Sequence, residues 1–315
     1  MSIKKITVIG AGNVGAEAAN QIVSKELANV VLLDKYGDIA KGKALDILTS
    51  ASLKNSSSSI IGTDDYSFTE NSDIVIITAG IPRKPGMSRE ELVETNGNII
   101  ADITKNIKKY SPDTIIIMVT NPLDVMTYLA YKVSGFKAEK VVGMAGVLDT
   151  VRFKTFIAEE LGVMAKDVNA MTLGGHGDEM VPLVDFATVS GIPLKQLIEP
   201  DVLEKIIERT QKGGAEIVKL LKTGSAYYAP AVSAVEMAEA IIKGRKSVLP
   251  AAAFLSGQYG IDNIHLGVPV VLGASGVEKI IEFDLGQKDL KKLQNSAAVV
   301  KETVNKLEKV MNIAK

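Results

Sequence analysis

The feature that most constrains the fold is a glycine-rich turn between a short apolar run and a helix-forming stretch. Residues 6–23 read ITVIGAGNVGAEAANQIV, so Gly10, Gly12 and Gly15 follow a β-branched strand and open a helix. In this context Gly10 makes the turn, Gly12 lets a pyrophosphate approach the backbone, and Gly15 permits close helix packing. The helix N-terminus adds unpaired N–H groups and a partial positive charge. The stretch predicts a dinucleotide-binding βαβ unit.

An acidic residue at the end of the next strand indicates which dinucleotide is bound. Asp34 follows Gly15 by 19 residues, close to the spacing of about 20 expected for an acid that binds ribose hydroxyls. A carboxylate there would repel a 2′-phosphate, which favours NAD over NADP, although the neighbouring Lys35 leaves some room for NADP. The alternative is that Asp34 is an ordinary acid at a strand end.

Short apolar runs alternate with helical patterns through the first half of the chain. Runs that are apolar on both faces are typical of a buried parallel sheet, and regular strand–helix alternation indicates a doubly wound α/β fold of the Rossmann type. The predicted strands are 6–9, 30–33, 74–78, 115–119 and 141–142, and the predicted helices are 13–26, 38–50, 89–109 and 123–133.

The second half has clustered strands between longer helices, which predicts a separate α+β substrate domain. Predicted helices are 149–162, 201–222, 228–243 and 287–312, and predicted strands are 168–173, 181–189, 247–255 and 268–283. The change of pattern near residues 143–146 predicts two domains, 1–145 for the dinucleotide and 146–315 for the substrate.

Composition excludes several classes of function. The chain has 36 Lys and Arg against 37 Asp and Glu, a net charge of −1, so neither nucleic acid nor an anionic membrane is an expected partner. Apolar runs such as 114–119 are far shorter than the roughly 20 residues of a membrane span. Cysteine is absent, which excludes disulfides, thiolate metal sites and cysteine nucleophiles. We expect a cytoplasmic protein without a metal.

Only two histidines are available for acid/base chemistry. His265, in IDNIHLGV, has no distinctive polar neighbours, and we expect it at the surface or at a strand end. His176 lies in the turn LGGHGD, residues 173–178, where flanking glycines could present its ring to a cleft. Its ordinary pKa of about 6.5 suits proton exchange near neutral pH, but the turn alone leaves a catalytic role undecided.

Two further motifs allow both a structural and a functional interpretation. Asp149 and Arg152 are three residues apart on a predicted helix, so they share a face. They form either a local ion pair or a functional set, in which Asp149 orients a histidine and Arg152 binds a carboxylate. Asn121, before Pro122, closes the fourth strand at the edge where ligands bind in such sheets. It is either a turn residue or a hydrogen-bonding partner of substrate and nicotinamide.

Taken together, the motifs resemble the lactate/malate dehydrogenase family in order and spacing over essentially the whole chain. The matching segments are Gly10–Gly15, Asp34, AGIPRKPGMSR at 79–89, VTNPLD at 119–124, GVLDTVRF at 146–153 and GGHGD at 174–178. The resemblance implies reversible hydride transfer between NAD and a 2-hydroxy acid.

The resemblance also implies a role for each residue of the site. His176 would take and return the hydroxyl proton, Asp149 would orient His176, and Arg152 would bind the carboxylate beside the reacting carbon. Asn121 would contact substrate and cofactor, and Arg89 would polarise the carbonyl. The implied NAD contacts are Gly10, Gly12, Asn13, Val14, Gly15, Asp34, Thr78, Ala79, Gly80, Asn96, Val119 and Asn121.

The substrate is predicted from the segment GIPRKPGMSREEL, residues 80–92, which in the family closes over the bound substrate as a lid. Members specific for lactate usually carry glutamine where this chain has Arg83. A guanidinium there would pair with a second carboxylate, a contact of about 1.5–3 kcal/mol. With pyruvate it would be left unpaired. We therefore expect the dicarboxylates malate and oxaloacetate. Lys84 has no predicted role beyond a solvated charge.

Other interpretations remain open. The closest is a dehydrogenase of the same family for lactate or another 2-hydroxy acid, and one of a different class is a non-catalytic, NAD-responsive binding module. Tyr128 and Lys132 have the spacing of a short-chain dehydrogenase pair, but the glycine spacing at residues 10–15 differs from that class. Relatives generally bury the helices near 38–50 and 225–230 between subunits, which implies a homo-oligomer, a tetramer rather than a dimer.

Overall fold

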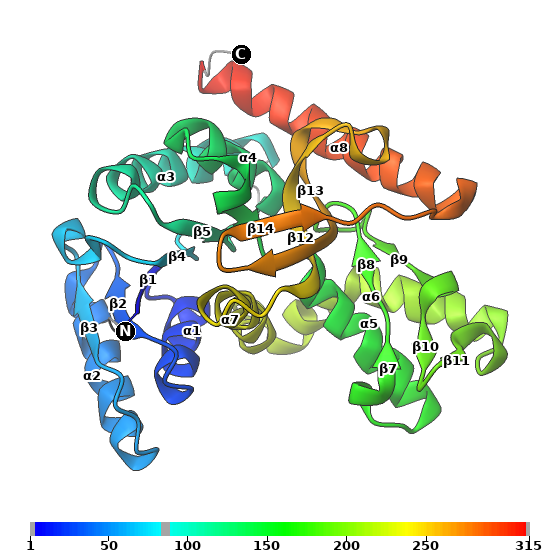
Figure 1. The fold of residues 1–315 in the computed structure, drawn as a ribbon, viewed down its shortest axis with the longest axis horizontal. Helices are drawn as coiled ribbons and strands as arrows, with labels where there is room; N and C mark the ends of the chain where they lie inside the picture. Colours follow the sequence, from blue (N-terminus) through cyan, green and yellow to red (C-terminus); the bar gives the residue numbers. More distant parts are fainter. Residues whose placement is uncertain (1–3, 83–88, 313–315) are drawn as a thin grey trace.

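The computed structural model describes residues 4–82 and 89–312, with only the helical backbone described for Arg89. In Figure 1 the N-terminal half (blue to green) forms a sheet with helices on both faces, and residues 146–221 of the C-terminal half (green to yellow-green) extend away from it. Helix α8 (Gly286–Val310) returns from the C-terminal half and packs against helices of the N-terminal half.

A nine-stranded sheet lies at the centre of the described residues, in the order β14-β13-β12-β6-β5-β4-β1-β2-β3. The six strands from β3 to β6 are parallel, and their order is that of doubly wound dinucleotide-binding folds. Every residue of β4 and β5 is buried, as their β-branched composition requires. The strands are β1 (Lys5–Ile9), β2 (Asn29–Leu33), β3 (Ile60–Thr63), β4 (Ile74–Ile77), β5 (Ile115–Met118) and β6 (Val141–Gly143).

Helices cover both faces of this sheet. Right-handed crossovers put the helices of the first two connections on one face and the later ones on the other. Helices α1 (Asn13–Ser24) and α2 (Gly37–Leu53) lie on one face with α7 (Tyr228–Ile242) against α1. Helices α3 (Arg89–Tyr110) and α4 (Leu123–Ser134) lie on the other face, where α8 packs against both. The expected Rossmann domain is confirmed.

The C-terminal half adds three antiparallel strands to the same sheet: β12 (Ser247–Ser256), β13 (Asp262–Gly273) and β14 (Gly276–Ile280). Beyond them, α5 (Gly146–Leu161) and α6 (Pro200–Leu221) enclose a second apolar core around Phe153. Of the short strands, β7 (Val168–Asn169) and β10 (Thr188–Val189) contribute to this second core, and β11 (Ile192–Pro193) pairs with β10. Strands β8 (Thr172–Leu173) and β9 (Val181–Pro182) carry Leu173 and Val181 of the main core instead. The α+β class is also confirmed.

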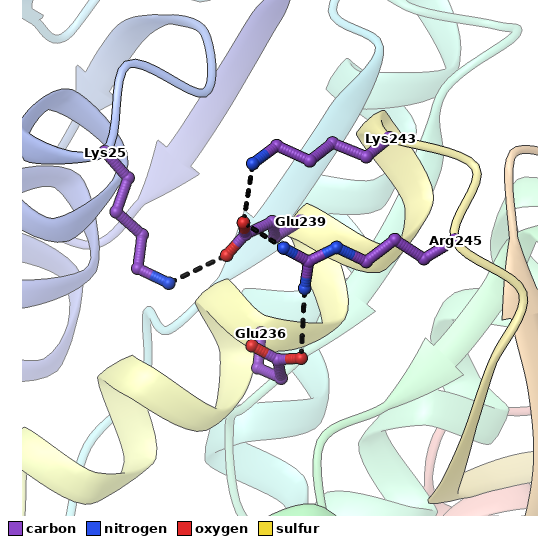
Figure 2. Close-up of polar contacts among 5 residues, drawn as sticks. All are labelled: Lys25, Glu236, Glu239, Lys243 and Arg245. Atoms are coloured by element: carbon purple, nitrogen blue, oxygen red, sulfur yellow. Dashed lines mark hydrogen bonds and ion pairs between the residues drawn. The ribbon is translucent and has the colours of Figure 1, made fainter.

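An ion cluster joins the two halves between α1 and α7 (Figure 2). Glu239 of α7 is 5% exposed and accepts bonds of 2.7 Å from both Lys25, after α1, and Lys243. Arg245 also contacts Glu239 and reaches Glu236 at 3.4 Å. The bonds from Lys243 and Lys25 lower the pKa of Glu239 to about 2, so this carboxylate stays ionised and continues to hold α1 at neutral pH.

Four expectations about strands differ from the structure. The predicted strand 168–173 is divided into β7 and β8, which belong to two different sheets. Strand β3 was not predicted, because Gly62 and the preceding serines resemble a loop; Gly62 is required where the backbone of Ala40 approaches. The predicted strand 268–283 is divided between β13 and β14 by a turn at residues 274–275, and Gly276, which begins β14, has φ +94°. The predicted strand 181–189 is only β9 and β10, separated by a 3-10 turn.

The expectation for His265 is wrong. This residue is 0% exposed and lies within β13, where its ring packs against Tyr131 and Phe254. Its Nε2 lies 3.3 Å from the carbonyl oxygen of Val141. Burial lowers the pKa of His265 to about 3, so the ring is a neutral part of the core at physiological pH.

Candidate active site

The glycine-rich turn joins β1 to α1 at the carboxyl edge of the parallel sheet. Gly10 has φ +103°, and a Cβ there would lie 2.7 Å from the backbone nitrogen of Ala79. A Cβ on Gly15 would lie 1.8 Å from the carbonyl oxygen of Gly10. Gly12, by contrast, is exposed and a Cβ there would meet nothing within 4 Å. Asn13 is likewise exposed and Val14 half-buried, so the start of α1 faces open space, as an incoming pyrophosphate requires.

Asp34 lies beside this turn, at the end of β2. Its Oδ2 accepts a 2.7 Å hydrogen bond from the backbone of Ala11, and its Oδ1 accepts one of 3.0 Å from Tyr36. Lys43 of α2 donates a 2.8 Å bond to the carbonyl oxygen of Ala11 from the other side. A carboxylate fixed next to an open glycine turn fits the adenosine ribose of a dinucleotide.

The strand ends after β4 and β5 form the adjoining part of the site. Thr78 donates a 3.0 Å bond to the carbonyl oxygen of Gly10, and a Cβ on Gly80 would lie 2.5 Å from the side chain of Thr120. Thr120 in turn bonds the carbonyl oxygen of Ala79 at 2.7 Å. These contacts hold the ends of β1, β4 and β5 in fixed positions next to the glycine turn.

Asn96 of α3 is 1% exposed and connects two segments of the site. Its Oδ1 accepts a 2.9 Å bond from the backbone of Ile81, and its Nδ2 donates a 2.7 Å bond to the carbonyl oxygen of Asn121. Both polar atoms of its side chain are therefore used to position backbone. The buried Val119 continues β5, while Asn121 is exposed at its end with its side chain available to a ligand.

His176 and Asp149 are brought together from different elements. His176 follows β8 in a turn, and its Nδ1 lies 2.9 Å from Oδ2 of Asp149, which is 2% exposed in the first turn of α5. Burial by itself lowers the pKa of His176, but the charge of Asp149 and its hydrogen bond outweigh burial, so the pKa lies above the ordinary 6.5. With Nδ1–H donated to Asp149, Nε2 is left for a substrate proton.

Arg152 lies on the other side of Asp149. Its Nη1 donates a 3.3 Å bond to Oδ1 of Asp149, while its Nε is buried and has no hydrogen-bond partner among the described residues. Its stem packs against the helix backbone of α6 at Gly213, where a Cβ would lie 3.2 Å from Cδ. Burial lowers the pKa of Arg152, which remains a cation with unused donors. Such a group binds a carboxylate.

Of the two arginines in the 80–92 segment, the structure describes only the backbone of one. Arg83 lies outside the described residues. Arg89 begins α3, and its side chain is not described. The described residues on either side are Ile81, which is bonded to Asn96, and the first turns of α3.

A cleft of about 500 Å³ opens between α3, α4, α8 and the His176 turn, and Asn121 and His176 both line it. A second cavity, of about 560 Å³, lies at the opposite, amino edge of the sheet. Its lysines include Lys4, paired with Asp73, and Lys140, near Asp113, and it contains no histidine. The larger cavity therefore lacks the acid/base chemistry of the cleft.

Comparison with known proteins decides the family. Residues 4–143 match the family model described as lactate/malate dehydrogenase, NAD binding domain, and residues 146–311 match the lactate/malate dehydrogenase alpha/beta C-terminal domain. The chain belongs to the lactate/malate dehydrogenase family. NAD is accordingly the dinucleotide of its N-terminal half, in agreement with the sequence prediction and with the open glycine turn.

Individual members of the family are similar over nearly their whole length. A malate dehydrogenase from Chlorobium limicola is 55% identical, over 98% of this chain and all of the relative. A crystal structure of Cryptosporidium parvum malate dehydrogenase matches with a TM-score of 0.95 and 42% identity, covering 98% of this chain and 100% of that one. The lactate dehydrogenase of the same organism, complexed with lactic acid and NAD, has a TM-score of 0.94 at 44% identity, covering 98% and 99%. Both branches share the fold.

Four residues that position this family site were not predicted. Lys43 holds the backbone of the glycine turn at Ala11, and Thr120 holds that of Ala79 after β4; their types gave no signal in the sequence. Asp124 accepts a bond from the backbone of His176, and Ser296 of α8 accepts one from Gly175. Asp124 was visible as the last residue of the VTNPLD motif, but nothing local in the sequence connects it to residue 176.

Tyr128, the residue that suggested a short-chain dehydrogenase, is buried in α4 and donates a 2.6 Å bond to Glu308 of α8. It serves the packing of two helices and not the cleft.

Among residues 4–82 and 89–312, no helix is both long and apolar enough to cross a membrane. In the same described residues, no group of three or more His, Cys, Asp or Glu side chains is arranged to hold a metal ion.

Proposed function

We propose that this chain is an NAD-dependent malate dehydrogenase that interconverts (S)-malate and oxaloacetate. The observation that carries the proposal is the set His176–Asp149–Arg152, in which the buried Asp149 contacts both other side chains and His176 lines the cleft beside the carboxyl ends of the parallel strands. It combines a proton carrier with an anion-binding group, as a 2-hydroxy acid requires. The similarity to proteins named malate dehydrogenase supports this choice of activity.

The residues of the chain perform binding, orientation and proton transfer. Bound NAD supplies the hydride chemistry, accepting hydride from malate and returning it to oxaloacetate. During oxidation the neutral Nε2 of His176 accepts the hydroxyl proton as the carbon–oxygen double bond forms. Asp149 keeps the donor on Nδ1 and stabilises the imidazolium that results, as its 2.9 Å contact allows. In the reverse direction the imidazolium returns that proton.

Substrate orientation is assigned to three arginines and an asparagine. The unused donors of Arg152 would bind the carboxylate next to the reacting carbon. Asn121, exposed at the end of β5, would hydrogen-bond substrate and nicotinamide. Arg89 would polarise the carbonyl and Arg83 would bind the distal carboxylate. These last two roles rest on the sequence motif.

The proposed cofactor residues occupy the glycine turn and the ends of β2, β4 and β5. Gly12 and Asn13 line the open start of α1, and Asp34 is placed for the ribose hydroxyls. The two proposed domains, 1–145 and 146–315, assign cofactor binding to the first and the acid/base pair to the second. The break between the two family matches, after residue 143, supports this boundary.

Steady-state rates with NADH and NADPH, each with oxaloacetate and pyruvate, test the proposal. We expect NADH with oxaloacetate to give the highest kcat/KM. Higher turnover of pyruvate would instead assign the chain to the lactate branch. NADH binding without oxidation by any 2-oxo acid would favour the non-catalytic binding module.

We also propose that the protein is a homotetramer. Helices α2 and α7 carry large apolar side chains that one chain leaves exposed: Ile39, Leu45, Leu48, Leu53, Tyr228 and Val232. An apolar surface of this kind is typical of a subunit interface. Light scattering over a dilution series is expected to give the mass of four chains, and the mass of two or one would contradict the proposal.

A further inference from the structure

The turn that carries His176 is held by three contacts, which come from α4, α8 and β13. Oδ2 of Asp124, in the first turn of α4, accepts a 2.8 Å bond from the backbone nitrogen of His176. Ser296 of α8 accepts a 2.9 Å bond from Gly175, and Gly174 pairs with Gly267 of β13. Of the three, only the contact from Asp124 is made by a charged group.

Close packing makes these contacts decisive for where His176 lies. A Cβ on Gly175 would be 2.7 Å from Cγ2 of Val300 in α8 and 3.5 Å from Oδ2 of Asp124. Gly174 has φ +89°, a conformation that favours glycine. The turn is therefore packed closely against α8 and hydrogen-bonded to both α4 and α8, so these two helices position His176 relative to Asp149.

If the role of Asp124 were only structural, burying its charged carboxylate would cost free energy without a benefit. Asp124 is 4% exposed, and its Oδ1 has no hydrogen-bond partner among the described residues. Burial raises the pKa of Asp124 to about 6, against the bond from His176, which lowers it. An uncharged acceptor of the same shape would hold the turn without the cost of a buried charge.

Among the described residues, the charged groups that shift the pKa of the imidazole come from two helices, α4 and α5. Asp149 and Asp124 raise the pKa of His176, and Arg152 lowers it. The α8 groups that contact the turn, Ser296 and Val300, are uncharged. The other charged groups that line the same cleft, within the part of the chain that the structure describes, are Glu90, Glu94, Asp178, Glu179, Glu302 and Lys306.

We propose that Asp124 is a positioning residue for the acid/base turn: it holds the backbone of His176 and supplies a second negative charge to its imidazolium. The inference rests on the proposed role of His176. Near neutral pH two carboxylates flank the imidazolium, which keeps the proton needed for oxaloacetate reduction on Nε2. Protonation of Asp124 in acid removes one of those charges and lowers the proton affinity of His176.

The direct test is a titration of His176 by NMR with ¹³C-labelled histidine. The chain has two histidines, and His265, with a pKa of about 3, does not titrate near neutral pH. The wild-type pKa is expected above 6.5, with a smaller inflection near pH 6 from Asp124. In Asp124→Asn, whose amide oxygen still accepts the bond, the pKa should fall by about 1 unit.

The same change should appear in kinetics. In the pH profile of kcat/KM for oxaloacetate reduction, the pKa of the alkaline limb should fall in Asp124→Asn by the same amount as the NMR pKa. At pH values above that pKa, kcat/KM should therefore be about tenfold lower than in the wild type. The affinity for NADH should be unchanged. Asp124→Ala, which also removes the acceptor, should lose more kcat. Asp289→Asn is the matched control, because Asp289 is another buried aspartate in a first helix turn and pairs with Lys292. It should leave the pKa of His176 unchanged.

The possible outcomes separate this inference from the proposed function. An unchanged His176 pKa in Asp124→Asn, or a wild-type titration without the inflection, would overturn the role of Asp124. The second observation needs no variant, so it decides the question even if Asp124→Asn does not fold. A wild-type protein that oxidises NADH with no 2-oxo acid would remove the proposed function, while the NMR comparison would still report on Asp124.

Discussion

Replacing His176 by asparagine is expected to lower kcat for oxaloacetate reduction by roughly 10²–10⁴-fold, the contribution usual for a positioned acid/base group. The amide is close in size to the imidazole and still reaches Asp149, but it cannot carry the proton that the product hydroxyl needs. The glycine turn and Asp34 are untouched, so NADH binding should persist. Stopped-flow absorbance at saturating NADH measures the first effect, and fluorescence titration of NADH measures the second.

The other histidine supplies the matched control. His265 is buried among aromatic rings and its Nδ1 has no partner among the described residues, so His265→Phe replaces one ring by another. We expect this variant to keep the wild-type kcat. If His176→Asn turned over at the wild-type rate, the proton would have to pass through a different group, and the acid/base assignment would be wrong.

The fold could be predicted well because its signals are local. The β-branched runs that became β1, β2, β4 and β5 are buried on both faces, so their composition alone identifies them. Helices such as α3 were predicted to within a residue at each end, since apolar periodicity, flanking prolines and glycines all agree. Strand β3 was not predicted because it is the edge strand of the described sheet, where burial is one-sided, and because a glycine is needed there for α2 to approach.

Residue types at the site could be predicted, but most of the contacts between elements could not. His176, Asp149 and Arg152 were found because they lie in short, unusual motifs. The contact of His176 with Asp124 spans 52 residues, and that of Gly175 with Ser296 spans 121. Such pairs exist only once α4, α8 and the turn are packed together. The error for His265 has the same origin, because no neighbour in sequence shows that the aromatic residues Tyr131 and Phe254 surround it.

Asn96 illustrates how packing changes the meaning of a predicted contact. The resemblance assigns it to NAD, yet its side chain connects the backbone of Ile81 with that of Asn121. A contact with the cofactor would have to be made alongside these bonds. The same residue thus joins the base of the 80–92 segment to the end of β5, so the position of the segment and that of Asn121 are linked.

The second large effect concerns substrate choice. In Arg83→Gln, kcat/KM for oxaloacetate is expected to fall relative to that for pyruvate by about a thousandfold, since each 1.4 kcal/mol corresponds to a factor of ten. A charge-assisted bond to the distal carboxylate contributes about 1.5–3 kcal/mol, and the unpaired guanidinium that pyruvate would leave under the closed segment costs several more. Glutamine removes both effects: oxaloacetate loses the charged partner of its distal carboxylate, and pyruvate no longer leaves a buried guanidinium unpaired.

Lys84→Gln is the matched control, because it removes the adjacent cation from the same segment without removing a group assigned to the substrate. If general attraction of a dianion set the preference, both variants would lower oxaloacetate turnover by similar amounts, and the effect would vanish at high salt because screening weakens long-range attraction. A specific pair with Arg83 should instead persist at high salt and be absent in Lys84→Gln. An unchanged substrate ratio in Arg83→Gln would mean that the second carboxylate is bound elsewhere in the cleft, by a residue such as Asn121 or Lys306.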